Sequence, residues 1–498
     1  MFRMRKMTRR AMCAALSGFG MCSAGMGRGW AQLITGQSHV QPNAGQLESK
    51  LELSSSSEKL VNVFRWARSQ AMAYAFDEGD PVGPWYEAVE PGREGFCIRD
   101  TCHQALGAEA LGLKRFNLNM LRKFAENISD SRDWCSFWEI DRNNLPAPVD
   151  YENDAAFWYN LPANFDLVDC CFRMYVWTGD RTYVEDPVFL SFYEHTVNDY
   201  VERWGLGADQ IMNRPRLLNM RGIYDPNQKF PRARGIPGYN EGDSEYVVGF
   251  DLLASERTAY QAFAHIEEVR GIAERAQEFL RKAAGVEALI ENTWWNREGH
   301  CFYQRLSANH QLEGCGPRRA SKALAPDWRR DVDADAGGFP VGATSDEEVE
   351  RLLDLSHVRL EYPEVSFSRV GDLVTNLMGV TLEFHSPLLA AVEGGCVEVT
   401  VRTLPGLGTT IDWAEIRNLP IRACNVTVRH EGTQKTTLTN ERGPALIWRA
   451  AFAGRHEKLF VNGEAMASSV ETDESGEPLS SVLVTMGAGG QVSVGTAA

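Results

Sequence analysis

Apolar residues recur at three- and four-residue spacing through most of the chain between 57 and about 379. This spacing is typical of amphipathic helices and predicts helices at 60–76, 101–111, 116–128, 165–178, 188–203, 246–268 and 272–293. Gly179 stands where a helix needs a left-handed C-cap, and Pro187 stands where the first turn of the next helix tolerates proline. The segment around these two residues therefore predicts a hairpin of antiparallel helices.

After about 395 the pattern changes to short stretches in which apolar and polar residues alternate, separated by Gly, Asn and Pro. Examples are VEVTVRTLP, ACNVTVRH, KTTLTN, ALIWRAAF, KLFVNG and SSVLVTM. A period of two is typical of strands with one buried face, so we expect an antiparallel β-sandwich. The chain is thus divided into a helical domain at 57–394 and a sandwich at 395–498. The preceding segment at 32–56 is rich in Ser, Gln and Asn and is expected to be a flexible leader.

The first 31 residues have the composition of an export signal. They contain six basic residues and no acid, and the apolar stretch from Ala11 is too short to span a bilayer. The Arg9–Arg10 pair before this stretch indicates the twin-arginine route, with cleavage after Ala31. A lipoprotein signal at Cys22 is the weaker alternative, because Phe19 stands where a leucine is expected. We therefore expect a periplasmic or secreted protein with no membrane insertion after signal removal.

The charge balance argues against polyanionic partners. The formal net charge of −16 falls to −22 when the six basic residues of the predicted signal are removed. A nucleic-acid-binding protein concentrates Lys and Arg on one face, and the sequence has no such stripe. We expect no nucleic-acid partner.

The cysteines do not predict a metal site. Of eleven cysteines, two lie in the predicted signal, which leaves an odd number without metal-finger spacing. Cys97 and Cys102 are close in sequence, and Cys170 and Cys171 are adjacent within an apolar helical pattern. We therefore expect buried thiols in a disulfide-poor fold that needs no disulfide for activity.

Two loops combine acids with aromatic residues at the start of helix-like runs: RGIPGYNEGDSEY at 234–246 and RLEYPEVSF at 359–367. Hydrolysis of a glycosidic bond needs one carboxylic acid to protonate the leaving oxygen and a second carboxylate to activate water or attack the anomeric carbon. Glu241 and Asp243 in the first loop, and Glu361 and Glu364 in the second, have the required chemistry. Capping of the following helices is the alternative role for each.

Three segments carry a resemblance to a known family: LIENTWWNREGHCFY, PGYNEGDSEY, and EYPEVSFSRVGDLVTNLMGV followed by VEVTVRTLPGLGTTIDWAEIRNLPIRACNVTVRH. The chain resembles the six-hairpin (α/α)6-barrel glycosidases, and its last third is similar to the end of α-L-rhamnosidases. A further similarity, through GPWYEAVEPGREGFCIRDTCHQ, is to bacterial proteins defined only at superfamily level. The run from Ser366 to Arg369 lacks the Asn-His of the rhamnosidase motif, and the rhamnosidases' acidic substrate-binding block has no clear counterpart, so rhamnose specificity is not implied.

The resemblance implies a mainly helical (α/α)6 barrel followed by an antiparallel β-sandwich, and places the acid on a mid-barrel loop and the base late in the barrel. Glu241 is accordingly the candidate acid and Glu364 the candidate base, with Asp243 and Glu361 as runners-up. A sugar also needs paired polar contacts and an aromatic face. Charged residues crowd within 93–103, and structural pairing is their alternative role. The candidate substrate-binding residues are Trp85, Arg93, Arg99, Asp100, His103, Trp138, Asn160, Asn164, Tyr239 and Tyr362.

Together these features predict an exported glycoside hydrolase that is exo-acting and inverting, acts on a neutral oligosaccharide or glycoconjugate, and needs no cofactor. No metal is expected: the acidic segment at 331–337 resembles a calcium loop, but Ala336 occupies the position that requires glycine. One alternative is a polysaccharide lyase, with Tyr239, His103 and Asn164 in the catalytic roles. The other is a carbohydrate-binding protein that has lost catalysis.

Overall fold

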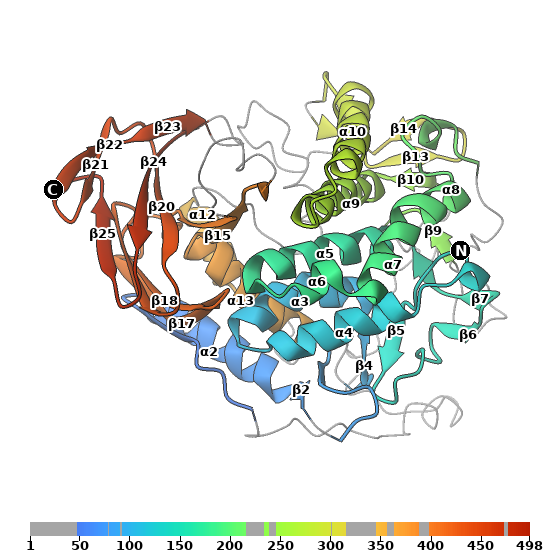
Figure 1. Ribbon diagram of the computed structural model, residues 1–498, viewed down its shortest axis with the longest axis horizontal. Coiled ribbons are helices and arrows are strands. Elements are labelled where there is room, and N and C mark those ends of the chain that lie inside the picture. The colour runs from blue at the N-terminus through green and yellow to red at the C-terminus, as the bar shows by residue number, and fades with distance from the viewer. Residues whose placement is uncertain are drawn as a thin grey trace, which may run out of the picture.

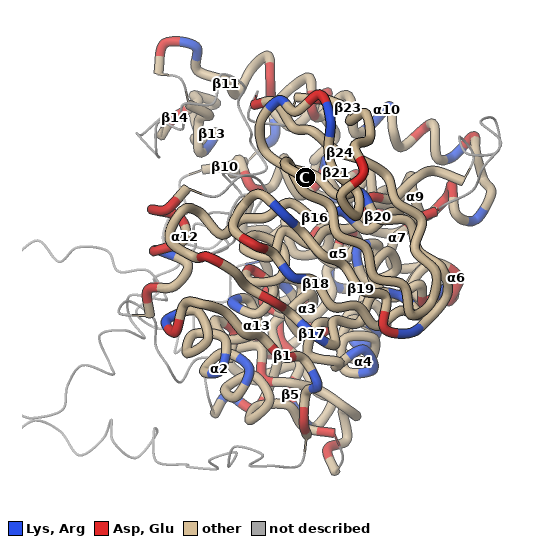
Figure 2. Tube along the Cα trace, turned by 90° about the vertical axis from the view of Figure 1, so that its left-hand side faces the viewer, with Lys and Arg blue, Asp and Glu red and all other residues tan. Residues whose placement is uncertain are grey.

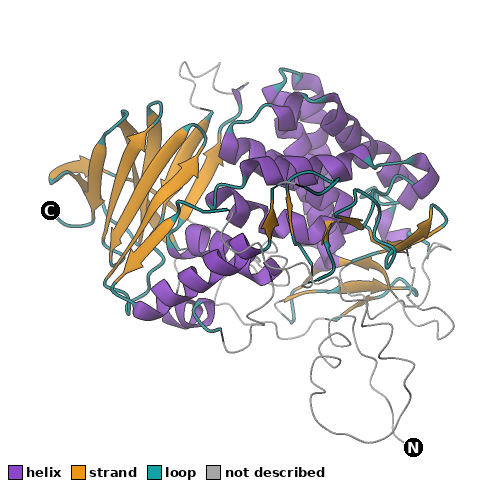
Figure 3. Cartoon of the chain, turned by 90° about the horizontal axis from the view of Figure 1, so that it is seen from below, coloured by secondary structure: helices purple, strands orange, loops and turns teal. Residues whose placement is uncertain are grey.

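The computed structural model describes residues 47–77, 79–89, 92–215, 234–238, 246–299, 301–314, 345–355, 363–387, 398–472 and 477–498. A helix-rich part is followed along the chain by a sheet-rich part (Figures 1 and 3). The helices are α2 (Glu58–Ala73), α3 (Ile98–Ala110), α4 (Lys114–Glu126), α5 (Pro162–Thr178), α6 (Thr182–Glu185), α7 (Pro187–His195), α8 (Val201–Trp204), α9 (Phe250–Val269), α10 (Ala273–Leu289), α12 (Asp346–Leu352) and α13 (Pro363–Asp372). All seven predicted helices are present.

The ends of the helices follow the local sequence signals. Ser57 caps α2 by accepting a hydrogen bond from the backbone N–H of Leu60. Gly179 ends α5 with φ at 69°, and Asp186 accepts from the N–H of Val188 at the start of α7. Phe165 near the start of α5 packs against Tyr200, which follows α7, so the two helices run antiparallel and the predicted hairpin is confirmed. One boundary was wrong: the segment predicted as a helix from 246 begins with strand β10 (Tyr246–Gly249), which pairs with β13 (Arg305–Ser307).

Four helices, α3, α5, α9 and α13, point their C-terminal ends toward the sheets. Trp177 near the end of α5 donates to the carbonyl of Pro420 at 2.9 Å, and α3 contacts the same strand, β17 (Trp413–Ile421). His265 near the end of α9 lies 5.1 Å from Phe384 between ring centroids. Helix α13 continues through a π-helical turn at Leu373–Leu377 directly into strand β15 (Val380–Phe384). The first turns of these four helices therefore lie at the end of the bundle away from the sheets.

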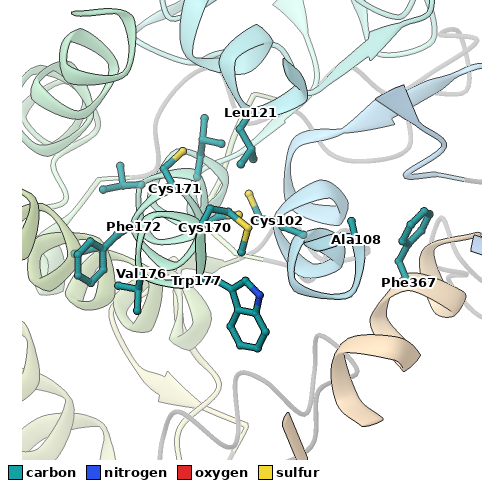
Figure 4. Packing of buried hydrophobic residues seen from close by; sticks show 14 of the residues in the cluster. Cys102, Ala108, Leu121, Cys170, Cys171, Phe172, Val176, Trp177 and Phe367 are labelled. Carbon is teal, nitrogen blue, oxygen red and sulfur yellow. The ribbon is translucent and has the colours of Figure 1, made fainter. Parts of the chain in front are cut away.

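Helices α3 and α13 approach each other closely at glycines. A Cβ on Gly107 would lie 2.8 Å from the carbonyl carbon of Phe367 and 3.1 Å from the backbone nitrogen of Gly371. On another side of α3, Cys102 lies beside Cys170 of α5 (Figure 4). Helix α3 thus lies between α5 and α13, and its packing depends on small residues.

The sheet-rich part contains two larger sheets. The first has the order β1-β17-β18-β19-β25-β21-β22 and the second β15-β16-β20-β24-β23. Apart from the parallel pair β16 and β20, their neighbouring strands are antiparallel. Their strands are β1 (Glu52–Ser55), β15 (Val380–Phe384), β16 (Val399–Thr403), β17 (Trp413–Ile421), β18 (Cys424–Glu431), β19 (Lys435–Arg442), β20 (Leu446–Ala453), β21 (Lys458–Val461), β22 (Glu464–Ala467), β23 (Ser469–Thr472), β24 (Pro478–Met486) and β25 (Gln491–Gly495).

Two predicted boundaries need correction. The leader was expected to be flexible up to residue 56, but β1 pairs with β17, and Leu51 and Leu53 are buried. The second sheet begins with β15 at Val380, before the predicted start of the β-domain at 395. The local sequence pattern misses β1 because this strand is ordered by a partner 358 residues further along the chain. Closure into a six-hairpin barrel and the sandwich arrangement of the sheets remain predictions.

Short strands connect the helices: β2 (Ala75–Phe76), β3 (Trp85–Tyr86), β4 (Gly95–Cys97), β5 (Glu139–Asp141), β6 (Tyr151–Asn153), β7 (Ala156–Phe157), β8 (Tyr159–Asn160), β9 (Arg234–Ile236), β10 (Tyr246–Gly249), β11 (Trp295–Asn296), β12 (Cys301–Phe302), β13 (Arg305–Ser307) and β14 (Leu312–Glu313). Two of them lead directly into helices that form the bundle end: β4 into α3 and β10 into α9. These junctions fix where the first turns begin.

The cysteines agree only in part with the expectation of a disulfide-poor fold. Six buried cysteines are free thiols: Cys97, Cys102, Cys135, Cys170, Cys171 and Cys424. Cys301 on β12, in contrast, is disulfide-bonded. Among the helices in the described ranges, none has the length and apolarity that crossing a membrane requires. Acidic and basic residues are both scattered along the trace in Figure 2.

Candidate active site

One arginine joins the N-terminal parts of three helices. Arg99 in the first turn of α3 places Nε 2.6 Å from Asp166 Oδ2 of α5 and Nη1 3.7 Å from Asp251 Oδ2 of α9. Ser255, one turn after Asp251, donates from Oγ to Asp166 Oδ1 at 2.8 Å. Arg99 is only 3% exposed, whereas the two carboxylates are 14% and 18% exposed. The bundle end thus carries a fixed charged cluster on three helices, which we call the Arg99 cluster (Arg99, Asp166, Asp251 and Ser255).

Opposing effects act on Asp166. Burial raises the pKa of its carboxyl above the usual value, while the charge of Arg99 and the hydroxyl of Ser255 act in the opposite direction. The positive ends of the helix dipoles of α3, α5 and α9 lie at the same end of the bundle and favour negative charge there. The end of the bundle is therefore suited to hold carboxylates, and carboxylates are the groups that glycosidic hydrolysis requires.

Three predicted residues lie at the same bundle end. Asp100 and His103 are half-buried in the first turns of α3, next to Arg99 in sequence. Glu364 is in the first turn of α13 and is 9% exposed. Because α3 and α13 cross at Gly107 and Gly371 with both C-terminal ends toward the sheets, their first turns lie on the same side of the molecule. The structure thus brings Arg99, Asp100, His103 and Glu364 to one end.

A second charged cluster adjoins the start of α3. Arg93 forms ion pairs with Glu139 and with Asp150, the latter at 3.3 Å between Nη2 and Oδ2. Glu139 opens β5, which pairs with β4, the strand that leads directly into α3. Burial raises the pKa of the nearby Glu87 to about 8, and the charge of Glu139 acts in the same direction. Glu87 is therefore protonated at neutral pH, which limits the negative charge that this buried cluster must hold.

Two predicted binding residues, Trp85 and Asn164, are buried and hydrogen-bonded within the protein. Trp85 is completely buried, stacks on Phe76 with 4.8 Å between ring centroids, and donates from Nε1 to Asp80 at 2.7 Å. Asn164 is also completely buried; its Oδ1 accepts from the Tyr159 hydroxyl, and its Nδ2 donates to the carbonyl of Trp134. Side chains whose polar atoms are already paired inside the protein are poorly placed to bind a ligand. We therefore leave Trp85 and Asn164 out of the candidate site.

Trp138 precedes Glu139 in sequence, and Asn160 precedes α5, which carries Asp166; both residues are buried. Trp138 makes an edge contact with Tyr159 at 6.1 Å between ring centroids. Asn160 ends β8 just before α5, and within the described part of the chain neither atom of its side-chain amide has a hydrogen-bond partner. An unsatisfied buried amide costs free energy, so Asn160 stays a candidate for ligand contact while Trp138 packs as a core residue.

Five predicted residues lie outside the described residues: Tyr239, Glu241, Asp243, Glu361 and Tyr362. The described chain on each side of 239–245 ends beside the Arg99 cluster. The N–H of Gly249 donates to the carbonyl of Pro237 at 2.6 Å, and Asp251 follows two residues later. The assignments of Glu241 and the other four residues therefore remain predictions.

Sequence reasoning did not select two residues of the Arg99 cluster: Asp251 and Ser255. Asp251 was hidden because the helix was predicted to start at 246, which placed this acid in the second turn instead of the first. An acid two residues after the glycine that ends a short strand is a signal that could have identified it. Within the described ranges, no group of three or more His, Cys, Asp or Glu side chains could hold a metal ion.

The comparisons with known proteins found structural similarity only. No family model and no curated protein match the chain. Among solved structures, an α-L-rhamnosidase from Dictyoglumus thermophilum matches with a TM-score of 0.48 at 11% identity, over 90% of this chain and 50% of that one. The GH78 family rhamnosidase of Bacillus sp. GL1 gives 0.45 at 13% identity, over 78% and 40%. A putative kojibiose phosphorylase from human microbiome gives 0.44 at 9% identity, over 89% and 67%.

The chain spans half or less of the two rhamnosidase chains. At TM-scores below 0.5 the similarity does not carry a functional argument, so the proposal below is based on the residues of this chain.

Proposed function

We propose that this protein is a glycoside hydrolase that acts on a neutral oligosaccharide or glycoconjugate. One observation carries the proposal: the N-terminal parts of α3, α5, α9 and α13 bring Arg99, Asp166, Asp251 and Glu364 to one end of a helical bundle. Carboxylates from several helices, placed at the positive ends of helix dipoles, are suited to acid and base catalysis on an uncharged substrate.

In the proposed reaction Glu364 is the general base and Glu241 the general acid. Glu364 takes a proton from water as the water oxygen forms a bond to the anomeric carbon. The glycosidic C–O bond breaks, and Glu241 gives its proton to the leaving oxygen. An inverting enzyme of this kind keeps its two carboxyl groups about 6.5–9.5 Å apart, whereas about 5–5.5 Å is typical of retention. Asp243 and Glu361 are the respective alternatives, and exo action is part of the proposal.

The charges favour a neutral substrate over a uronic acid. Arg99 is held between Asp166 and Asp251, and Arg93 between Glu139 and Asp150, so the charge of each arginine is already compensated by carboxylates. A uronate would have to compete with two carboxylates at either position. The lyase alternative is further weakened because Asn164, its candidate for neutralising a uronate, is buried with its amide paired.

The proposal can be tested with a panel of aryl glycosides and neutral oligosaccharides, with the configuration of the first product followed by NMR. We expect inversion. Glu364→Gln should slow activated and unactivated substrates alike, while Glu241→Gln should spare substrates with good leaving groups. Glu350→Gln, which removes an exposed ion pair with Lys59, is the control with unchanged activity.

Three other outcomes would replace the proposal. An unsaturated product that absorbs in the ultraviolet would identify a lyase. Strict dependence on phosphate would identify a phosphorylase. Binding of oligosaccharides without turnover would identify a carbohydrate-binding protein.

We also propose that the chain is exported to the periplasm or beyond through its N-terminal segment. The supporting features are Arg9–Arg10 and the apolar stretch after them, which lie outside the described residues. Replacement of both arginines by lysine should retain the protein in the cytoplasm with residues 1–31 uncleaved. Export of the variant with normal cleavage would contradict the twin-arginine route.

A further inference from the structure

The carboxylate of Asp251 contacts two separate parts of the structure. Its Oδ2 lies 3.7 Å from Arg99 Nη1 of α3. Its Oδ1 lies against the backbone of two glycines: a Cβ on Gly238 would be 2.5 Å from this oxygen, and a Cβ on Gly249 would be closer still. Both glycines are thus needed for space beside Asp251. Neither has a positive φ, so backbone conformation does not explain them.

The two glycines belong to chain segments that meet at this point. Gly238 follows β9, and Gly249 ends β10. The Gly249 N–H donates to the carbonyl of Pro237, and a Cβ on Gly238 would lie 3.2 Å from Gly249 Cα. The carboxylate of Asp251 therefore packs against the backbone of two hydrogen-bonded segments, at Gly238 and Gly249. It also faces the guanidinium of Arg99, which joins α3 to α5.

We propose that Asp251 is a positioning residue of the candidate active site. Its charge holds Arg99 and the paired segments 234–238 and 246–249 in one arrangement, so that the first turns of α3, α5 and α9 keep fixed relative positions. The alternative role is a simple favourable interaction with the dipole of α9. A dipole interaction alone would need neither an arginine from another helix nor two glycines against the carboxylate.

The kinetic part of this inference rests on the proposed glycosidase function. Charged and titratable groups face Asp251 from three elements: Arg99 from α3, Asp166 from α5 and Tyr246 from β10, whose hydroxyl lies 3.3 Å from the Cβ position on Gly238. Asp251→Asn keeps the shape of the side chain and removes its negative charge. The pKa of each remaining carboxyl nearby should then fall, because one source of repulsion is lost and the charge of Arg99 is less compensated.

Two measurements on the whole protein test the inference. Hydrogen exchange should become at least tenfold faster at the amides of 234–238 and 246–249 in Asp251→Asn. The kcat should fall at least tenfold with a KM within threefold of wild type, and the pH profile of kcat/KM should move to lower pH. Gly249→Ala should accelerate the same amides.

The controls are matched to each variant. Glu287→Gln removes the ion pair between α10 and Arg257 on the same helix α9, and Gly285→Ala adds a Cβ in α10 where no atom lies within 4 Å. Both controls should leave exchange at 234–238 and 246–249 and the kinetics unchanged.

The outcomes separate the inference from the proposed function. Unchanged exchange in Asp251→Asn would overturn the positioning role, whatever the activity. Faster exchange with kcat, KM and the pH profile unchanged would reduce Asp251 to a structural residue and also overturn it. A wild-type protein that cleaves no glycoside would remove the proposed function, and faster exchange would then still support positioning of the two segments.

Discussion

Replacement of Gly107 by alanine should weaken the contact between α3 and α13. The added Cβ would overlap the carbonyl oxygen of Phe367, its nearest neighbour, and would lie 2.8 Å from the carbonyl carbon of Phe367 and 3.1 Å from the nitrogen of Gly371. All three are backbone atoms that cannot rotate away. Carbon contacts are optimal at about 3.5–4.0 Å, so the helices would have to separate by roughly 1 Å or more. Overpacking costs roughly 1–3 kcal/mol and more for an overlap of this size, and the better helix propensity of alanine offsets about 1 kcal/mol. We expect a net loss of at least about 2 kcal/mol.

Urea unfolding followed by tryptophan fluorescence would measure this loss. Gly285→Ala in α10 is the matched control, because no atom lies within 4 Å of its Cβ position, and it should stabilise by up to about 1 kcal/mol. Gly107→Ala should also lower kcat/KM, since α3 and α13 carry Arg99 and Glu364 to the proposed site. If Gly107→Ala were as stable as the control, α3 and α13 would not meet at this glycine.

Three further predictions concern buried and site residues. Burial lowers the pKa of His430 to about 4, so between about pH 6.5 and 4 the unfolded protein takes up a proton at this residue that the folded protein does not. This uptake lowers the free energy of unfolding as the pH falls. His430→Gln should remove roughly 3 kcal/mol of that loss, which urea unfolding across this pH range would measure. Burial raises the pKa of Glu256 to about 8, so the wild-type protein loses stability as the pH rises, opposite to the effect of His430. The free energy of unfolding of Glu256→Gln should therefore rise relative to wild type by about 2 kcal/mol between about pH 6 and 7.5. A difference that stays constant over this range would contradict the protonated state of Glu256. Asp100→Asn should weaken the transition state by roughly 2–4 kcal/mol in kcat/KM at unchanged Tm, and full activity would make this residue structural.

Helical spacing predicted all seven helices because apolar residues that recur at three- and four-residue spacing are a local property of the sequence. The start at 246 failed for an identifiable reason. Tyr246 to Gly249 continue the apolar pattern of α9, but their backbone pairs with β13, about 60 residues along the chain. Strand β1 failed in the same way, since only pairing with β17 gives its four residues a regular structure. Local pattern indicates which face is buried, and distant partners decide the backbone.

The site was less accessible to sequence reasoning than the fold. Charged residues at 93–103 indicated Arg93 and Arg99, but the carboxylates paired with them come from β5, α5 and α9 and are joined only by tertiary packing. Composition also could not separate Trp85 and Asn164, which belong to the core, from residues at the bundle end. An aromatic or amide side chain serves equally well in a core and in a sugar site, so residue type alone does not decide.

Strand β1 has a consequence for how the chain is made. Its hydrogen-bond partner β17 is 358 residues further along, so during synthesis β1 stays unpaired until β17 has left the ribosome. The helices between them form from local contacts and can fold earlier, while completion of the first sheet comes last and joins the two ends of the domain. A ribosome-bound chain that stops before β17 should therefore leave residues 47–56 open to protease, whereas in the finished protein this segment is protected at the sheet edge.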